Sequence, residues 1–174
     1  YDYEWGMPRA QMLARMQHAM DRALDHVWEG REVDPTIMDR HALLVLASMI
    51  ERETGSADER PLVARVFLNR LHQGMRLQSD PTVVYGLNHG VGPLGHALSH
   101  ADLLQPTPYN TYVITGLPPG PICSPGMAAL EAAARPAQGD QLYFVANGHG
   151  GHDFAATLGD HNHNVSAFRA ARRG

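Results

Sequence analysis

Apolar residues recur at helical spacing through most of the first half of the chain. This period predicts amphipathic helices over residues 8–29, 36–54 and 58–73. The middle helix is expected to start at Asp34-Pro35, where a capping side chain precedes a proline suited to the first turn. Consecutive helices joined by a short turn normally pack as a hairpin, so the second and third helices should lie against each other.

The pattern changes after residue 74, where short alternating segments are mixed with short helical ones. The expected elements are strand 75–78, helix 80–85, loop 86–98, a one-turn helix after Ser99, strand 109–114 within the proline-rich segment 105–126, helix 125–134, strands 142–146 and 152–154, and helix 158–172. Helices come first and strands later, which favours an α+β fold over alternating β-α-β units. We expect a helical hairpin packed with a small mixed-strand region, short helices, and a C-terminal hairpin plus helix.

The stretch 44–54 is the most informative part of the chain. Seven apolar or small residues are followed by Glu51 and Glu53, which point about 200° apart on a helix. Glu51 lies four residues after Ala47 and seven after Leu44, on the side expected to be buried. Burial raises the pKa of a carboxylic acid, which then suits a general acid near neutral pH. The structural alternative is that Glu51 pairs with an arginine or caps a neighbouring helix.

Composition narrows the function further. The 174 residues suit one domain, and an apolar content of 44% allows a sizeable core. No apolar run reaches the roughly 18 residues that a membrane span needs. A net charge of -4 without an arginine stripe argues against a nucleic-acid partner. Cys123 is the only cysteine, which excludes an intrachain disulfide and a cysteine-based metal cluster.

Other catalytic classes have weaker support in the sequence. His149-x-x-His152 and His161-x-His163 leave a zinc hydrolase open as an alternative, although no HExxH motif is present. Neither a Gly-x-Ser-x-Gly nucleophile elbow nor a nucleotide-binding glycine pattern occurs. Glycosidases use two carboxylates, for which Glu51 and Asp80 would be the pair. A lytic transglycosylase needs only one acid, which later serves as the base. We expect no metal and no cofactor.

Several strings carry a family resemblance. They are Leu46-Ala47-Ser48-Met49-Ile50-Glu51-Arg52-Glu53-Thr54, Val66-Phe67-Leu68-Asn69-Arg70-Leu71, residues 74–86 (GMRLQSDPTVVYG), Pro108-Tyr109-Asn110-Thr111-Tyr112, residues 116–122 (GLPPGPI), Leu142-Tyr143-Phe144-Val145-Ala146 and Gly151-His152-Asp153-Phe154. In this order, from about Trp28 to about His161, they resemble the bacterial endolytic murein transglycosylases, the MltG or YceG-like family. The family's usual lysine between the two glutamates is replaced here by Arg52.

The resemblance implies an enzyme that cuts nascent peptidoglycan strands internally at the MurNAc-GlcNAc β-1,4 bond and leaves 1,6-anhydro-MurNAc ends. The first glutamate of the family's Ser-x-x-Glu-x-Glu segment, the catalytic one, falls on Glu51. The candidates to line the glycan groove or orient Glu51 are Glu53, Asn69, Gln78, Asp80, Tyr85, Asn110, Tyr112 and His152. Support of the fold is the alternative role for each of these eight residues.

The family also implies a location and partners. Full-length members carry an N-terminal transmembrane helix and a LysM-like subdomain, neither of which this sequence contains. Residues 1–174 are therefore expected to form a single catalytic subdomain, attached to the bacterial inner membrane only through that anchor and facing the periplasm. Its expected partners are peptidoglycan glycan strands, with cell-wall synthases as a further class to test. The main alternative function is a non-catalytic peptidoglycan-binding module that docks such synthases.

Overall fold

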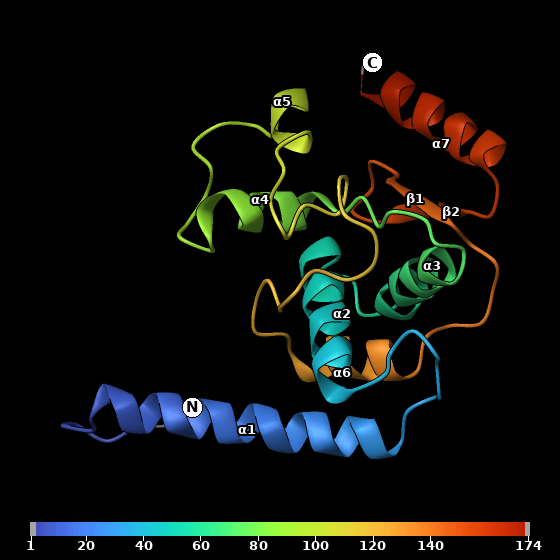
Figure 1. Cartoon of the computed structure of the whole chain (residues 1–174). Coiled ribbons are helices and arrows are strands. Elements are labelled where there is room, and N and C mark those ends of the chain that lie inside the picture. Colours follow the sequence, from blue (N-terminus) through green and yellow to red (C-terminus); the bar gives the residue numbers. More distant parts are fainter. Residues whose placement is uncertain (1–2, 173–174) are drawn as a thin grey trace.

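The computed structural model describes residues 3–172, and helix α2 (Arg40–Glu53) lies at its centre (Figure 1). The Asp39 carboxylate caps this helix by accepting a hydrogen bond of 2.8 Å from the Ala42 amide. Leu43 and every residue from Val45 to Ile50 are buried. Burial therefore surrounds α2 on all sides rather than following one stripe.

Three helices pack around α2. They are α1 (Arg9–Glu29), α3 (Arg60–His72) and α6 (Met127–Ala134). The first half of α1 extends beyond the other helices and leaves Leu13 and Met16 exposed (Figure 1). The largest side chains buried between the helices are Phe67, Leu43, Leu46, Met49, Ile50, Leu68 and Leu130. Each such side chain contributes about 1.5–3 kcal/mol to folding, so this cluster is the main source of stability.

The remaining elements gather near the C-terminal end of α2 (Figure 1). They are α4 (Asp80–Asn88), α5 (His100–Leu103), β1 (Tyr143–Ala146), β2 (His152–Ala155) and α7 (Leu158–Ala171). The two strands form an antiparallel hairpin in which Tyr143 pairs with Ala155 and Ala146 with His152. The hairpin packs on α3 through β1, and α7 covers both strands.

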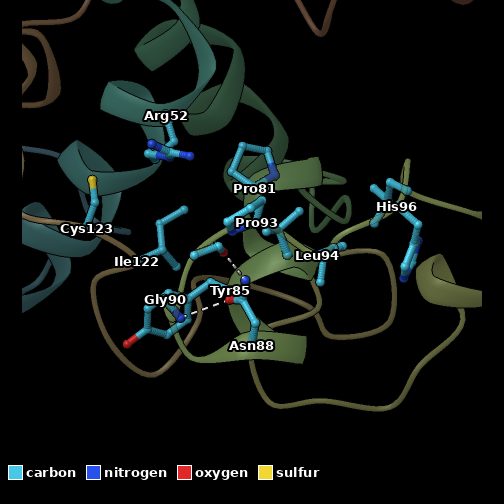
Figure 2. A pocket seen from close by; sticks show the side chains of 13 residues that line it. Arg52, Pro81, Tyr85, Asn88, Gly90, Pro93, Leu94, His96, Ile122 and Cys123 are labelled. Atoms are coloured by element: carbon cyan, nitrogen blue, oxygen red, sulfur yellow. Dashed lines mark hydrogen bonds between the residues drawn. The ribbon is translucent and has the colours of Figure 1, made fainter.

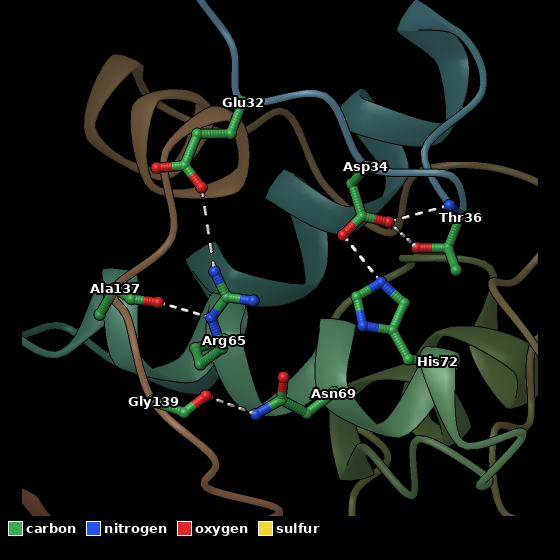
Figure 3. A network of polar contacts seen from close by, with 8 residues as sticks. All are labelled: Glu32, Asp34, Thr36, Arg65, Asn69, His72, Ala137 and Gly139. Carbon is green, nitrogen blue, oxygen red and sulfur yellow. Dashed lines mark hydrogen bonds and ion pairs between the residues drawn. The ribbon is translucent and has the colours of Figure 1, made fainter.

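A polar network joins the α1–α2 connection to α3 (Figure 3). Asp34 accepts hydrogen bonds from the amide (2.8 Å) and the hydroxyl of Thr36, and its second oxygen lies 2.8 Å from Nε2 of His72. Arg65 of α3 donates to the carbonyl of Ala137. The expected helix start at residue 36 is therefore wrong, because Asp34 stabilises a local turn and Asp39 caps α2 instead.

The predicted α+β fold is confirmed: seven helices occur in the described residues, with one two-stranded antiparallel sheet followed by a C-terminal helix. Two expected strands are wrong. Residues 75–78 belong to no strand, and Gln78 among them has a left-handed φ of 54°. Residues 109–114 form turns in which the amides of Val113 and Ile114 both donate to the Asn110 carbonyl at 2.9 Å. A β-forming composition does not make a strand where no neighbouring strand is available.

Candidate active site

A polar cavity of about 220 Å³ lies between the end of α2, the segment leading into α4, and the hairpin. Its lining residues are Glu53, Arg70, Leu77, Gln78, Asp80, Tyr112, Phe144, Val145, Ala146 and His152. The structure thus brings together five of the nine residues singled out from the sequence, although they are separated by up to 99 positions in the chain. Glu53 is among them and Glu51 is not.

Glu53 supplies the most strongly perturbed carboxyl group of this cavity. It is the last residue of α2 and accepts a hydrogen bond from the hydroxyl of Ser79, whose own amide donates to Oγ1 of Thr111 at 2.9 Å. Burial raises the pKa of Glu53 to about 7, and the nearby negative charge of Asp80 adds to the rise. The bond from Ser79 and the positive field of His152 oppose it. Near neutral pH this carboxyl can therefore both give and take a proton.

Asp80 and Tyr112 form a hydrogen-bonded pair in the cavity. The phenol of Tyr112 donates to Oδ1 of Asp80 at 2.6 Å. Burial and the Asp80 carboxylate raise the pKa of Tyr112 far above its usual value, so the phenol stays protonated. Asp80 also lies in the first turn of α4, where the helix dipole favours a negative charge. The Asp80 carboxylate is thus held in place, and its Oδ1 already accepts the hydrogen bond from Tyr112.

Arg70 holds together two walls of the cavity and was not singled out from the sequence. Its Nε donates to the Leu142 carbonyl at 2.7 Å, and its Nη1 reaches the carbonyl of Leu77 at 3.0 Å and Oε1 of Gln78 at 3.3 Å. Gln78 adopts a left-handed backbone conformation (φ 54°). A hydrogen bond from its backbone amide to the Thr111 carbonyl helps to fix this conformation. Arg70 thus positions Gln78 and adds a positive charge to the cavity.

His152 is oriented by Glu59, a second residue that the sequence reading missed. Glu59 accepts from the His152 amide at 2.7 Å and from its Nδ1 at 2.8 Å, and it also accepts from the Thr54 hydroxyl at 2.8 Å. Burial works to raise the pKa of Glu59, but these hydrogen bonds outweigh it and lower that pKa. The Glu59 carboxylate therefore fixes the imidazole ring through Nδ1, and within residues 3–172 no hydrogen bond is recorded for the other nitrogen, Nε2.

Glu51 lies on another side of α2. Its Oε2 accepts a hydrogen bond of 3.1 Å from the Gly126 amide at the start of α6, and its Oε1 lies 3.8 Å from the guanidinium of Arg60. The Glu51 side chain is 30% exposed. The expectation that Glu51 closes the buried side of the helix is wrong, and the ion pair and helix cap weighed as its alternative are both present. Its catalytic role stays a prediction.

Three other predicted site residues lie outside this cavity. The amide of Asn69 donates to the carbonyls of Gly139 (3.2 Å, Figure 3) and Gln141 (2.9 Å). Asn110 is fully buried and its amide donates to two backbone carbonyls, at 3.0 and 2.8 Å. Tyr85 packs on the ring of Tyr109, with centroids 4.7 Å apart. In this structure the contacts of Asn69 and Asn110 support the fold.

Tyr85 belongs to a second, larger cavity of about 750 Å³ (Figure 2). This cavity lies between α4, the loop that follows it, and the segment around Ile122. Arg52 borders it, one residue before Glu53, and Pro81 borders it, one residue after Asp80. The two cavities are therefore neighbours on the same two helix ends.

A signal for Arg70 was present in the sequence. Val63, Phe67 and Arg70 follow one another at spacings of four and three, so the arginine stands on the buried face of α3. A cation on an apolar stripe is rarely fully buried without a specific partner. Glu59 gave no comparable signal, because its contacts come from residues 152 and 54, which only the folded chain brings close.

The histidine pairs considered for zinc are separated by other contacts. His152 bonds to Glu59, and His161 stacks on Tyr143 with ring centroids 5.1 Å apart. Within residues 3–172 no group of three or more His, Cys, Asp or Glu side chains is arranged to hold a metal ion. None of the helices in the same range combines the length and apolar character that a membrane crossing requires.

The fold and the cavity define a class: an α+β domain with one strongly desolvated carboxyl group facing a polar pocket, as general acid–base chemistry requires. The chain belongs to the YceG-like family, whose sequence profile matches residues 1–167. It is 45% identical over 122 residues to the endolytic murein transglycosylase of Bacillus subtilis, covering 70% of this chain and 33% of that protein. It is 34% identical over 161 residues to the protein of that name from Streptococcus pneumoniae (strain D39), covering 89% and 28%.

A solved structure agrees with the family membership. A crystal structure of a yceG-like protein from Listeria monocytogenes superimposes with a TM-score of 0.76 at 36% identity, covering 94% of this chain and 51% of that chain. The present chain thus spans about a third of the length of the curated relatives and half of the solved one. The predicted resemblance is confirmed.

Proposed function

We propose that residues 1–174 form the catalytic subdomain of an endolytic lytic transglycosylase. Its reaction is cleavage of the MurNAc-GlcNAc β-1,4 bond within nascent peptidoglycan strands, with formation of 1,6-anhydro-MurNAc ends. The family membership and the names of two relatives, both endolytic murein transglycosylases, support the substrate class. The observation that carries the chemistry is the Glu53 carboxyl, held in a polar cavity with a pKa of about 7.

One carboxyl group is sufficient for this reaction. In the first step the protonated acid donates its proton to the glycosidic oxygen as the bond from that oxygen to the anomeric carbon breaks. In the second step the resulting carboxylate accepts the proton of the muramic 6-hydroxyl while that oxygen bonds to the same carbon. Water does not enter, and the acid is restored. A pKa near 7 suits both steps, because an acid–base catalyst works best near the ambient pH.

Glu53 fits this role better than Glu51, the residue expected from the sequence. The Glu51 carboxylate is engaged by Arg60 and by the Gly126 amide, and it does not border the cavity. Glu53 borders the cavity together with Gln78, Asp80, Tyr112 and His152. We therefore assign the acid–base role to Glu53 and a structural role at the start of α6 to Glu51.

The other polar groups of the cavity are suited to hold a sugar. Arg70 offers hydrogen-bond donors, the phenol oxygen of Tyr112 offers an acceptor because its proton is bound to Asp80, and the side-chain amide of Gln78 offers both donors and an acceptor. Nε2 of His152 lies on the side of the ring away from Glu59. We assign these four residues to the hydroxyl and acetamido groups of the sugars next to the cleaved bond. Phe144 supplies an apolar face of the kind on which a sugar ring packs.

The proposed substrate also implies where in the cell the protein works. Peptidoglycan lies outside the cytoplasmic membrane, so the domain would work there, attached to the inner membrane and facing the periplasm as the family resemblance implies. Cell-wall synthases are the proposed protein partners, because a cut in a nascent strand has to be made near the enzyme that extends it.

The experiment is product analysis by mass spectrometry after incubation of the protein with nascent, uncrosslinked strands. Internal fragments with 1,6-anhydro-MurNAc ends are expected. Reducing ends would identify a hydrolase, and a loss of activity with chelators would then favour the zinc alternative. Intact strands that nevertheless bind the protein would identify the non-catalytic binding module.

A further inference from the structure

The 750 Å³ cavity is lined by other residues than the polar cavity that contains Glu53 (Figure 2). Its walls are apolar and polar in similar measure, and the apolar side chains are Pro81, Val84, Pro93, Leu94, Leu98 and Ile122. Its volume falls within the range of pockets that enclose a small ligand. Most of the sugar-facing polar groups described above are in the neighbouring cavity, so this one suits a ligand with apolar as well as charged parts.

Arg52 is the only residue with a formal charge among those that line this cavity. Its guanidinium projects from the end of α2 above Ile122 and Pro93 (Figure 2), and the structure records no ion pair for it within residues 3–172. Of the two carboxylates next to it in sequence, Glu51 is engaged by Arg60, and Glu53 borders the other cavity. The Nδ1 of His96, also on the rim, lies 3.7 Å from Asp102. Arg52 is exposed, and an arginine at the border of a pocket lined by no carboxylate favours an anionic ligand.

The larger cavity lies next to the cavity in which the proposed bond cleavage takes place. Arg52 directly precedes Glu53, and Pro81 directly follows Asp80. In each of these pairs, one residue lines the larger cavity and its neighbour lines the smaller one. Adjacent Cα atoms are about 3.8 Å apart, and adjacent helix residues point about 100° apart. A group attached to the sugar held beside Glu53 could therefore enter the larger cavity without crossing the domain.

We infer that this cavity binds the peptide stem of the muramic acid next to the cleaved bond, with Arg52 pairing with a stem carboxylate. The inference rests on the proposed function, because the muramic acid carries the stem on its lactyl group. Stems combine alanine methyl groups with the carboxylates of acidic residues. The methyl groups match Val84, Leu94 and Ile122, and a carboxylate matches the guanidinium. The enzyme therefore selects strands that still carry their stems.

The test compares kcat/KM on stem-bearing strands with kcat/KM on strands from which an amidase has removed the stems. The wild-type protein should prefer stem-bearing strands, and Arg52→Gln should reduce that preference about tenfold, the value of one charge-assisted contact. Arg169→Gln is the matched control, since it removes an exposed arginine from α7 and should keep the preference. Leu94→Glu, which places a carboxylate in the cavity, should reduce the preference as well.

A binding measurement separates this inference from the proposed function. In the Glu53→Gln protein, a soluble muramyl tripeptide should bind in calorimetry, and Arg52→Gln should weaken its Kd about tenfold. If the wild type cuts no strands but the tripeptide binds through Arg52, the proposed function fails and the stem site stands. An unchanged preference in Arg52→Gln, or a Kd that does not depend on Arg52, would overturn the inference.

Discussion

Replacement of Glu53 by glutamine is expected to stabilise the protein above neutral pH. In the folded state the pKa of Glu53 is about 7, whereas its ordinary value is 4.5. The unfolded chain therefore loses this proton as the pH rises through 4.5, while the folded protein keeps it up to about pH 7. The contribution of Glu53 to the free energy of unfolding is therefore largest below pH 4.5, falls between pH 4.5 and 7, and stays constant above pH 7.

The size of the effect follows from the two pKa values. They differ by about 2.5, and each pKa unit corresponds to about 1.4 kcal/mol. The wild type should thus lose about 3 kcal/mol of unfolding free energy from Glu53 between pH 4.5 and 7. Glutamine resembles the protonated acid in shape and cannot ionise. The stability of Glu53→Gln relative to the wild type should therefore rise by about 3 kcal/mol over this interval.

Urea unfolding at pH 4.5, 6, 7 and 8.5, followed by tryptophan fluorescence, measures the difference. The comparison of variant with wild type at each pH removes the titrations that the two proteins share. Glu51→Gln is the control on the same helix, because it removes a partly exposed carboxylate paired with Arg60 at 3.8 Å. It should change stability by at most about 1 kcal/mol and without a rise between pH 4.5 and 7. A constant difference for Glu53→Gln, or a rise for Glu51→Gln instead, would refute the reasoning.

Three further predictions follow from the contacts of individual side chains. Arg70→Met should lower stability by about 3 kcal/mol, because it leaves the buried Leu77 carbonyl and the half-buried carbonyls of Leu142 and Arg76 without this donor. A melting temperature equal to the wild type would contradict this role. Asn110→Ala should cost about 2–3 kcal/mol, since a fully buried amide loses three hydrogen bonds, and a loss below 1 kcal/mol in urea unfolding would count against it. Glu59→Gln should destabilise the protein at pH 7 and far less at pH 3, because hydrogen bonds from His152 and Thr54 lower the pKa of Glu59 and the stabilisation by its carboxylate disappears as the pH falls. Urea unfolding of both proteins at the two pH values measures the difference, and an equal loss of stability at both would contradict the prediction.

The helices and the hairpin could be predicted because their signals are local. Hydrophobic periodicity and the glycine-rich turn act within a few residues, and the corresponding elements lie within a few residues of their expected positions. The start of α2 was missed because Asp34 and Asp39 are both good caps, and only the bonds from Thr36 and His72 show how Asp34 is used. The expected strand at 109–114 fails because strand formation depends on a neighbouring strand.

The choice between the two glutamates could not be made from periodicity. The spacing correctly places Glu51 and Glu53 on different sides of α2, but nearly every residue before them is buried, so no single stripe marks the inward side. Which side is desolvated is decided by Ser79, Asp80 and His152, which arrive from distant parts of the chain. The same holds for Arg52, whose cavity is made by the loop after α4.

The most direct test of the central claim is single-turnover cleavage of nascent strands by Glu53→Gln and Glu51→Gln, compared with the wild type at pH 7. Both variants replace a carboxylate by an amide of the same size on the same helix, and circular dichroism verifies that each is folded. Glu53→Gln should lower the rate of anhydro-end formation by at least about a thousandfold, because it removes the only acid–base group of the proposed reaction. Glu51→Gln should keep the rate within about tenfold of the wild type. Full activity in Glu53→Gln, with activity lost in Glu51→Gln, would contradict the account.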